Sequence, residues 1–184
     1  MTDEQKPQAS LSRKLLYLIV PLFIVVAIWF GFMVKAKYFP PKAIHYHAGF
    51  IVVKNNKIED FSNIKYMHTK PCGNAPASEK ETEAEQQIEK AHLHDFIGDV
   101  VHVHRAGAIW KDLFANLTYQ IDYADAEGYI NGKKIPDFQN QPIKPYDSLV
   151  VFNGKNQDVT KYLKQAITRS HIEQTEKRSD NCGS

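Results

Sequence analysis

An uninterrupted apolar segment near the N-terminus divides this 184-residue chain into two unequal parts. The segment from Leu15 to Val34 contains no charged residue. As a helix rising about 1.5 Å per residue, it would be about 30 Å long, which is the thickness of the hydrocarbon core of a bilayer. The sequence therefore predicts a single transmembrane helix over residues 15–34 and restricts the folded domain to the residues that follow.

The residues on either side of this segment favour a retained anchor over a cleaved signal peptide. Met33-Val34-Lys35-Ala36-Lys37 lacks the small-residue pattern of a cleavage site. Lysine or arginine residues flank the segment on both sides, so the positive-inside rule gives no orientation. We expect a disordered tail over residues 1–14 and a proline-containing spacer over residues 35–43.

The cysteines supply the evidence on orientation. The chain has only two, Cys72 and Cys182, far apart in the sequence. One disulfide in an oxidising compartment explains such a sparing pair, and two unrelated thiols are the alternative. With the disulfide, the prediction is a single-pass protein of the cytoplasmic membrane with its C-terminal domain outside the cytoplasm. Its partners would be the lipid bilayer and a membrane or extracytoplasmic protein.

Residues 44–156 show the patterning of one small domain. Asn-Asn and Asn-Gly between short apolar runs predict two hairpins, and helical spacing of apolar residues predicts a helix between them. The predicted elements are strands over 48–54 and 57–61, a strand over 99–105, a helix over 109–117, a hairpin over 128–135 and a strand over 148–152. A C-terminal helix over 157–178, capped by Asp158, and a tail over 179–184 complete the chain.

The acidic run before the second histidine pair has two interpretations. Ser78 with Glu81 three residues later forms a capping-box pattern, which predicts a short solvated helix to about Ala91. A disordered acidic loop is the alternative.

The order of elements predicts an α+β fold, a small mixed sheet with one or two packed helices. The phrase Tyr129-Ile130-Asn131-Gly132-Lys133, leading to Ile143-Lys144-Pro145-Tyr146-Asp147 and an apolar strand, resembles the later part of β-grasp, or ubiquitin-like, domains. That resemblance covers roughly residues 45–153 and implies a β-grasp-like arrangement, since hairpin, helix, hairpin and last strand follow in that order.

Charge and motifs exclude some function classes. The formal net charge is +2, and basic residues are interspersed with acidic ones, so the basic stripe of a nucleic-acid-binding protein is missing. The sequence also lacks His-Glu-x-x-His, Gly-x-Ser-x-Gly, a phosphate-binding glycine loop and Cys-x-x-Cys. No catalytic or organic-cofactor residue is therefore predicted, and an enzyme is disfavoured.

Histidine pairs carry the strongest functional signal. Six of the eight histidines fall in three His-x-His pairs: His45/His47, His92/His94 and His102/His104. In a strand, residues two apart point to the same side, so each pair offers two imidazoles in one direction. Zn²⁺ and Cu²⁺ take several nitrogen ligands of this kind, and the six histidines are the predicted metal ligands. Asp95 is predicted to orient one ligand imidazole by accepting a hydrogen bond from the ring N–H that points away from the metal.

A second resemblance rests on the same residues. His92-Leu93-His94-Asp95, Gly98 and His102-Val103-His104 are similar to a pattern in small membrane-anchored, His-rich extracytoplasmic proteins of bacteria and archaea. That likeness leaves the role open.

Three functional hypotheses remain. The first is a membrane-anchored domain that binds Zn or Cu, for metal handling or as a metal-stabilised interaction module. The second is a metal-independent structural or adhesion domain in which the imidazoles form hydrogen bonds, and the third is a zinc-dependent hydrolase or hydratase. A proton-sensing cluster is a further alternative.

Overall fold

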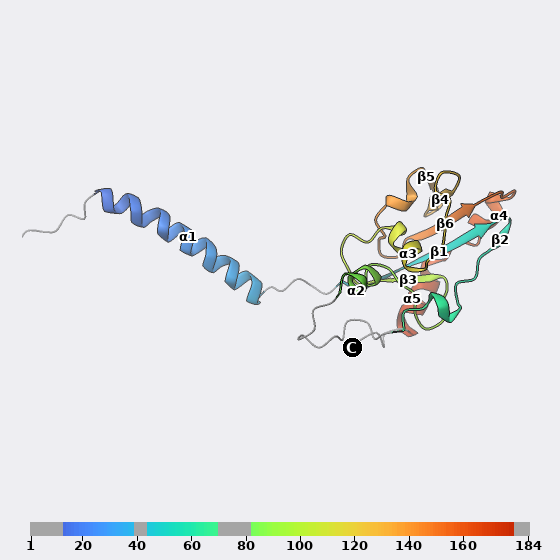
Figure 1. Ribbon diagram of the computed structural model, residues 1–184, viewed down its shortest axis with the longest axis horizontal. Helices are drawn as coiled ribbons and strands as arrows, with labels where there is room; N and C mark the ends of the chain where they lie inside the picture. The colour runs from blue at the N-terminus through green and yellow to red at the C-terminus, as the bar shows by residue number, and fades with distance from the viewer. Residues whose placement is uncertain (1–12, 39–43, 70–81, 179–184) are drawn as a thin grey trace, which may run out of the picture. The chain divides into compact units, whose positions relative to one another are not determined.

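The computed structural model describes residues 13–38, 44–69 and 82–178 (Figure 1). The chain divides into two compact units, Met1–Lys42 and Ala43–Ser184, and each is described by itself. Cys72 and Cys182 lie outside the described residues, as do Ser78 and Glu81 of the predicted capping box. The predicted disulfide and that cap therefore stay predictions.

The first unit contains one helix, α1, over Arg13–Tyr38. Within the described residues, no helix combines the length and the apolar character needed to cross a bilayer. This finding overturns the predicted transmembrane helix over residues 15–34 and the single-pass membrane location drawn from it.

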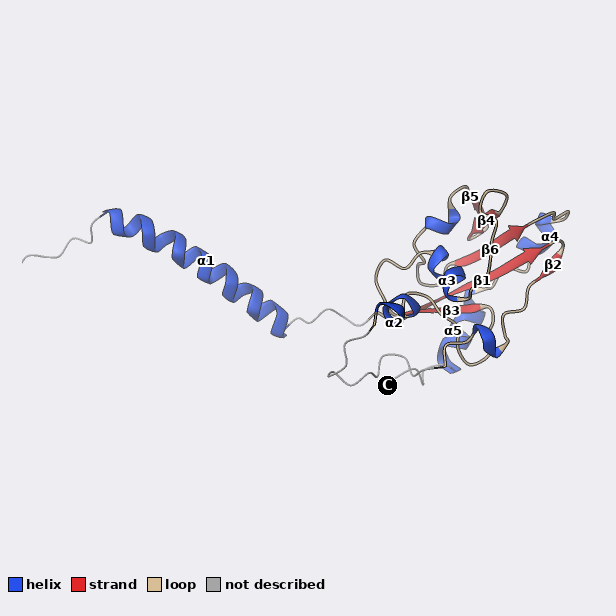
Figure 2. Cartoon of the chain, in the orientation of Figure 1, coloured by secondary structure: helices blue, strands red, loops and turns tan. Residues whose placement is uncertain are grey.

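The second unit is built on a mixed sheet (Figure 2). Its strands run in the order β2-β1-β6-β4-β5, with β3 paired to β1, and β1 and β6 are parallel while the other pairs are antiparallel. The strand bounds are β1 Tyr46–Lys54, β2 Lys57–Ile58, β3 Val100–Val103, β4 Glu127–Ile130, β5 Lys133–Ile135 and β6 Ser148–Asn153. The α+β class and the mixed sheet are thus confirmed.

Both hairpins turn where the sequence predicts. Asn55 and Asn56 have φ angles of 51° and 65°, and Asn131 and Gly132 have φ angles of 52° and 77°. Asparagine and glycine tolerate this left-handed region better than other residues, and two consecutive positive φ angles give the twist that flanking strands need. These turns fix the register of β1 with β2 and of β4 with β5.

Four short helices surround the sheet. They are α2 Glu83–Ile88, α3 Trp110–Asn116, α4 Val159–Leu163 and α5 Arg169–Arg178, and two 3₁₀ turns cover Ile64–Tyr66 and Phe138–Asn140. The cap of α2 is Thr82 with Glu85, in a reciprocal capping box. The predicted C-terminal helix over 157–178 is divided into α4 and α5, since the first ends at Leu163.

The two faces of the sheet carry separate apolar cores. On one face, Ala48, Phe50 and Val52 of β1 pack with the buried residues of α3. On the other, Ile51 and Val53 pack with Phe152 and with Tyr162 of α4. Since successive residues of a strand point to opposite faces, His47 lies on the same face as Ile51 and Val53. This is the face against which α5 packs at β1.

Candidate metal centre

Strand register brings the three histidine pairs together. His47 lies opposite His102 in the antiparallel pairing of β1 with β3, and His92 lies opposite His102 on the other side of β3. The two backbone hydrogen bonds between His92 and His102 are 3.1 and 2.9 Å long. Three neighbouring extended segments therefore present their histidines on one side, and this alignment required the sheet to form.

A seventh imidazole joins this group. The His68 N–H donates to the carbonyl of Leu93 at 2.6 Å, and the rings of His68 and His92 are 5.1 Å apart. The neighbouring residue Met67 packs against the main apolar core and does not belong to this group. We call His45, His47, His68, His92, His94, His102 and His104 the histidine face.

His102 lies at the centre of the histidine face. It has no exposed surface, and its Nδ1 atom is 2.8 Å from Nε2 of His47 and also 2.8 Å from Nε2 of His94. The ring centroids of His102 and these two residues are only 3.9 and 3.5 Å apart. Imidazoles from three separate segments thus meet at one ring nitrogen.

His45, His102 and His104 form a second group around the same ring. One nitrogen from each residue lies within 4.8 Å of the others, close enough to hold a metal ion. The rings of His45 and His104 stack at 4.6 Å with an angle of 12°. His102 is buried, His104 is half-buried and His45 is exposed, so the group reaches from the interior to solvent.

Two nitrogens of this trio lack hydrogen bonds. Nε2 of His102 and Nε2 of His104 are buried and have no hydrogen-bond partner in the part of the chain that the structure describes. An unsatisfied buried polar group costs about 1–3 kcal/mol. Both atoms have lone pairs available to a cation if the ring proton is held elsewhere or lost.

Carboxylates contact the outer nitrogens of two other rings. Oδ2 of Asp95 is 2.6 Å from Nδ1 of His94, and Oε1 of Glu176 is 3.5 Å from Nδ1 of His47. Glu176 is itself held by the hydroxyl of Tyr146, which donates to it at 3.1 Å. A carboxylate behind an imidazole keeps the proton on the outer nitrogen and leaves the inner lone pair free, as in metal-ligating histidines.

Burial keeps these imidazoles neutral. It lowers the pKa of His92 to about 3 and that of His104 to about 4, and neighbouring histidines add to the effect. The pKa of His102 is lowered by burial and by His47, and that of His94 is lowered by burial although Asp95 opposes it. Neutral imidazole is the form that binds metal ions, so the folded domain offers its histidines in the protonation state that coordination needs.

His171, which the sequence places on the charged side of the last helix, stands apart from the histidine face. Its Nε2 atom is 3.0 Å from Oδ2 of Asp99, and 46% of its side chain is exposed. No local pattern indicated that Glu176 would contact His47, because Glu176 lies in α5 and His47 lies in β1.

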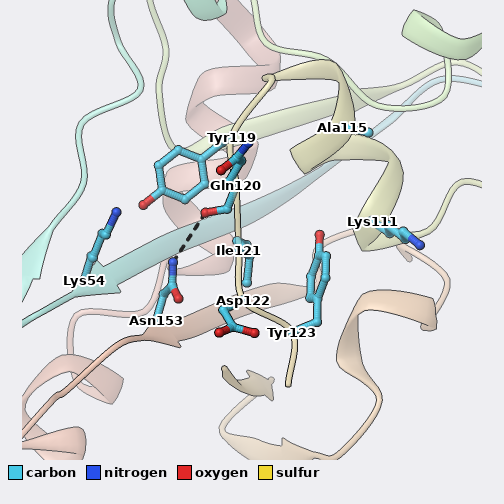
Figure 3. A pocket seen from close by; sticks show the side chains of 9 residues that line it. All are labelled: Lys54, Lys111, Ala115, Tyr119, Gln120, Ile121, Asp122, Tyr123 and Asn153. Atoms are coloured by element: carbon cyan, nitrogen blue, oxygen red, sulfur yellow. Dashed lines mark hydrogen bonds between the residues drawn. The ribbon is translucent and has the colours of Figure 1, made fainter. Parts of the chain in front are cut away.

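A separate cavity of about 630 Å³ has no residue of the histidine face in its lining (Figure 3). Lys54, Lys111, Tyr119, Tyr123 and Asn153 are among its lining residues, and none of those residues is a histidine. Across it, the Asn153 side-chain amide donates to the carbonyl of Gln120 at 3.5 Å, the only hydrogen bond drawn between the residues in the view.

Comparisons with protein families, with curated proteins and with solved structures found no match to this chain. The β-grasp likeness and the likeness to His-rich anchored proteins therefore remain resemblances in sequence pattern and element order, and the functional argument rests on the site itself.

Proposed function

We propose that the histidine face binds a Zn²⁺ or Cu²⁺ ion through His45, His102 and His104, and that the domain serves in metal handling. Two observations carry this proposal. One nitrogen of each of these residues lies within 4.8 Å of the others. Nε2 of His102 and Nε2 of His104 are buried and have no hydrogen-bond partner among the described residues, and an ion bound by these two atoms would satisfy both.

The alternative of a purely structural hydrogen-bond network fits these atoms less well. In such a network each buried imidazole nitrogen would donate to, or accept from, a neighbouring group. Among the described residues, two nitrogens at the centre of the face have no such neighbour. Their lack of partners favours a ligand that brings positive charge.

Donor chemistry narrows the ion. All three donors are imidazole nitrogens, which suit Zn²⁺ and Cu²⁺, whereas Ca²⁺ and Mg²⁺ prefer oxygen and Cu⁺ prefers sulfur. Zn–N distances of about 2.0–2.1 Å in a tetrahedral site place ligand nitrogens about 3.3 Å apart. The nitrogens of the trio lie within 4.8 Å of one another, so they would have to approach by up to about 1.5 Å to hold an ion in this way.

Exposure and charge favour binding and exchange over hydrolysis. His45 is exposed, so an ion has a route from solvent, and three protein ligands leave a fourth position for a donor from a second molecule. Asp95 and Glu176 contact the outer nitrogens of His94 and His47. A carboxylate in that position orients the imidazole ring, whereas a general base for hydrolysis would lie beside the trio.

The test is metal content in matched variants of the full chain. We expect at least one Zn or Cu per chain after dialysis, measured by elemental analysis, and at least one ion fewer per chain in a His45→Ala/His104→Ala double variant. His171→Ala is the control, because His171 lies outside the histidine face, and it should retain the ion. Wild-type protein that retains neither metal would overturn the proposal.

A further inference from the structure

Resting on the proposed function, we infer that the histidine face holds two metal ions, one on each ring nitrogen of His102. The first ion is the one bound with His45 and His104. The second lies on the Nδ1 side, where Nε2 of His47 and Nε2 of His94 approach His102. His102 thus bridges a dinuclear centre.

Hydrogen bonding alone does not account for the Nδ1 side. A ring nitrogen of imidazole carries either one hydrogen or one lone pair in the ring plane, so it makes one good hydrogen bond. Nδ1 of His102 has two nitrogen neighbours at the same distance, 2.8 Å. At most one of these contacts is a normal two-centre hydrogen bond, and the other has no hydrogen of its own.

The neighbouring carboxylates indicate which ring nitrogens of His94 and His47 carry lone pairs. Because Asp95 lies 2.6 Å from Nδ1 of His94, the ring proton of His94 stays on Nδ1 and its Nε2 presents a lone pair. Glu176, at 3.5 Å, favours the same form of His47. Lone pairs of His47 and His94 therefore face His102 together, and a single hydrogen on Nδ1 of His102 can satisfy only one of them fully, whereas a cation satisfies both.

An ion fits after a small opening of this group. Tetrahedral coordination at about 2.0–2.1 Å requires nitrogens about 3.3 Å apart, roughly half an ångström more than the spacing seen here. The ring centroids must separate as well, because the rings of His94 and His102 are 3.5 Å apart in this structure.

The other ring nitrogen of His102, Nε2, binds the first ion. With Nδ1 directed to His47 and His94, the unpartnered Nε2 of His102 is left for the group with His45 and His104. On binding the second ion, the remaining N–H bond of His102 breaks, a metal–nitrogen bond forms and the proton passes to solvent. The two ions would be roughly 6 Å apart, about 2 Å beyond each nitrogen of one ring.

Copper titration of the full chain tests the bridge. We expect two Cu²⁺ per chain by elemental analysis. The electron paramagnetic resonance intensity per copper should fall several-fold as the second equivalent binds, because a shared imidazole couples the two spins. Retention of a single ion would refute this inference and leave the proposed function standing, whereas retention of none would refute both. Two ions whose signals simply add would refute the bridge.

Matched variants assign the two positions. His45→Ala/His104→Ala and His47→Ala/His94→Ala should each retain one uncoupled Cu²⁺, and His171→Ala should retain the coupled pair. Asp95→Asn serves if the double variants do not fold, since Asp95 has a side chain that is 58% exposed. It should weaken only the second ion by about 10–100-fold. Unchanged affinity of both ions in Asp95→Asn would count against the assignment of His94.

Discussion

One face of β1 changes character along its length. At one end Ile51 and Val53 pack with Phe152 and Tyr162 in an apolar core, while at the other end His47 is buried among imidazoles and beside Glu176 of α5. The apolar end is stabilised by the removal of apolar surface from water. The histidine end buries polar atoms, two of which have no hydrogen-bond partner among the described residues, so the two ends should respond differently to metal, to pH and to substitution.

The largest effect is expected at the apolar end and should not depend on metal. Phe152 is 3% exposed and its ring packs against those of Tyr129 and Tyr162. Phe152→Ala should lower the free energy of unfolding by about 3–5 kcal/mol, because it leaves a cavity. Chemical denaturation with and without chelator measures this loss, and a loss that differs between the two conditions would break the comparison.

Metal removal should act only through the histidine end. At an ion concentration about 100 times the dissociation constant, binding stabilises the folded state by about 2.7 kcal/mol. Thermal unfolding of the wild type should therefore shift down on addition of chelator, and His45→Ala/His104→Ala should show a smaller shift, because it lacks the ion that these two residues hold. A chelator-induced shift of equal size in that double variant would place the ion elsewhere.

Acid should destabilise the metal-free domain through the same end. The pKa of His92, which is 2% exposed, falls from 6.5 unfolded to about 3 folded. Between these values the unfolded chain binds more protons, so stability is fully present above pH 6.5 and is lost as the pH falls toward 3. On acidification from pH 6.5 to 5, one such imidazole lowers the free energy of unfolding by up to about 2 kcal/mol.

The measurement for acid sensitivity is the urea midpoint of chelator-treated protein at several pH values. His104, with its pKa lowered to about 4, should add to the fall in the same direction. His171→Ala should show the wild-type slope. A midpoint that stays constant from pH 7 to 5 would contradict the prediction.

The smallest effect is expected for the histidine outside the face. His171 contacts Asp99 at 3.0 Å, and both side chains are more than one-third exposed. Exposed ion pairs contribute about 0–1 kcal/mol, so His171→Ala should change stability by no more than that and leave metal content unchanged. A larger loss by chemical denaturation would show that α5 depends on this contact.

Local pattern was sufficient for much of the fold. Asn55-Asn56 and Asn131-Gly132 specify tight turns through their tolerance of positive φ, and both turns form. The strand predicted over residues 99–105 forms as β3, and its Val101 and Val103 side chains lie in the main apolar core. The predicted C-terminal helix was wrong in its continuity, since α4 ends at Leu163 and α5 begins at Arg169. The spacing of apolar residues did not reveal that break.

Local pattern was enough to establish that each His-x-His pair points two imidazoles in one direction, because that follows from the twofold repeat of an extended chain. Which pairs meet depended on the fold of the whole domain. The register of β1 with β3 sets His47 opposite His102, and the bridge on the other side of β3 adds His92 and His94. His102 lies 55 positions after His47 in the sequence, and Glu176 lies 129 positions after it. Both contact His47 through long-range pairing that no local pattern encodes.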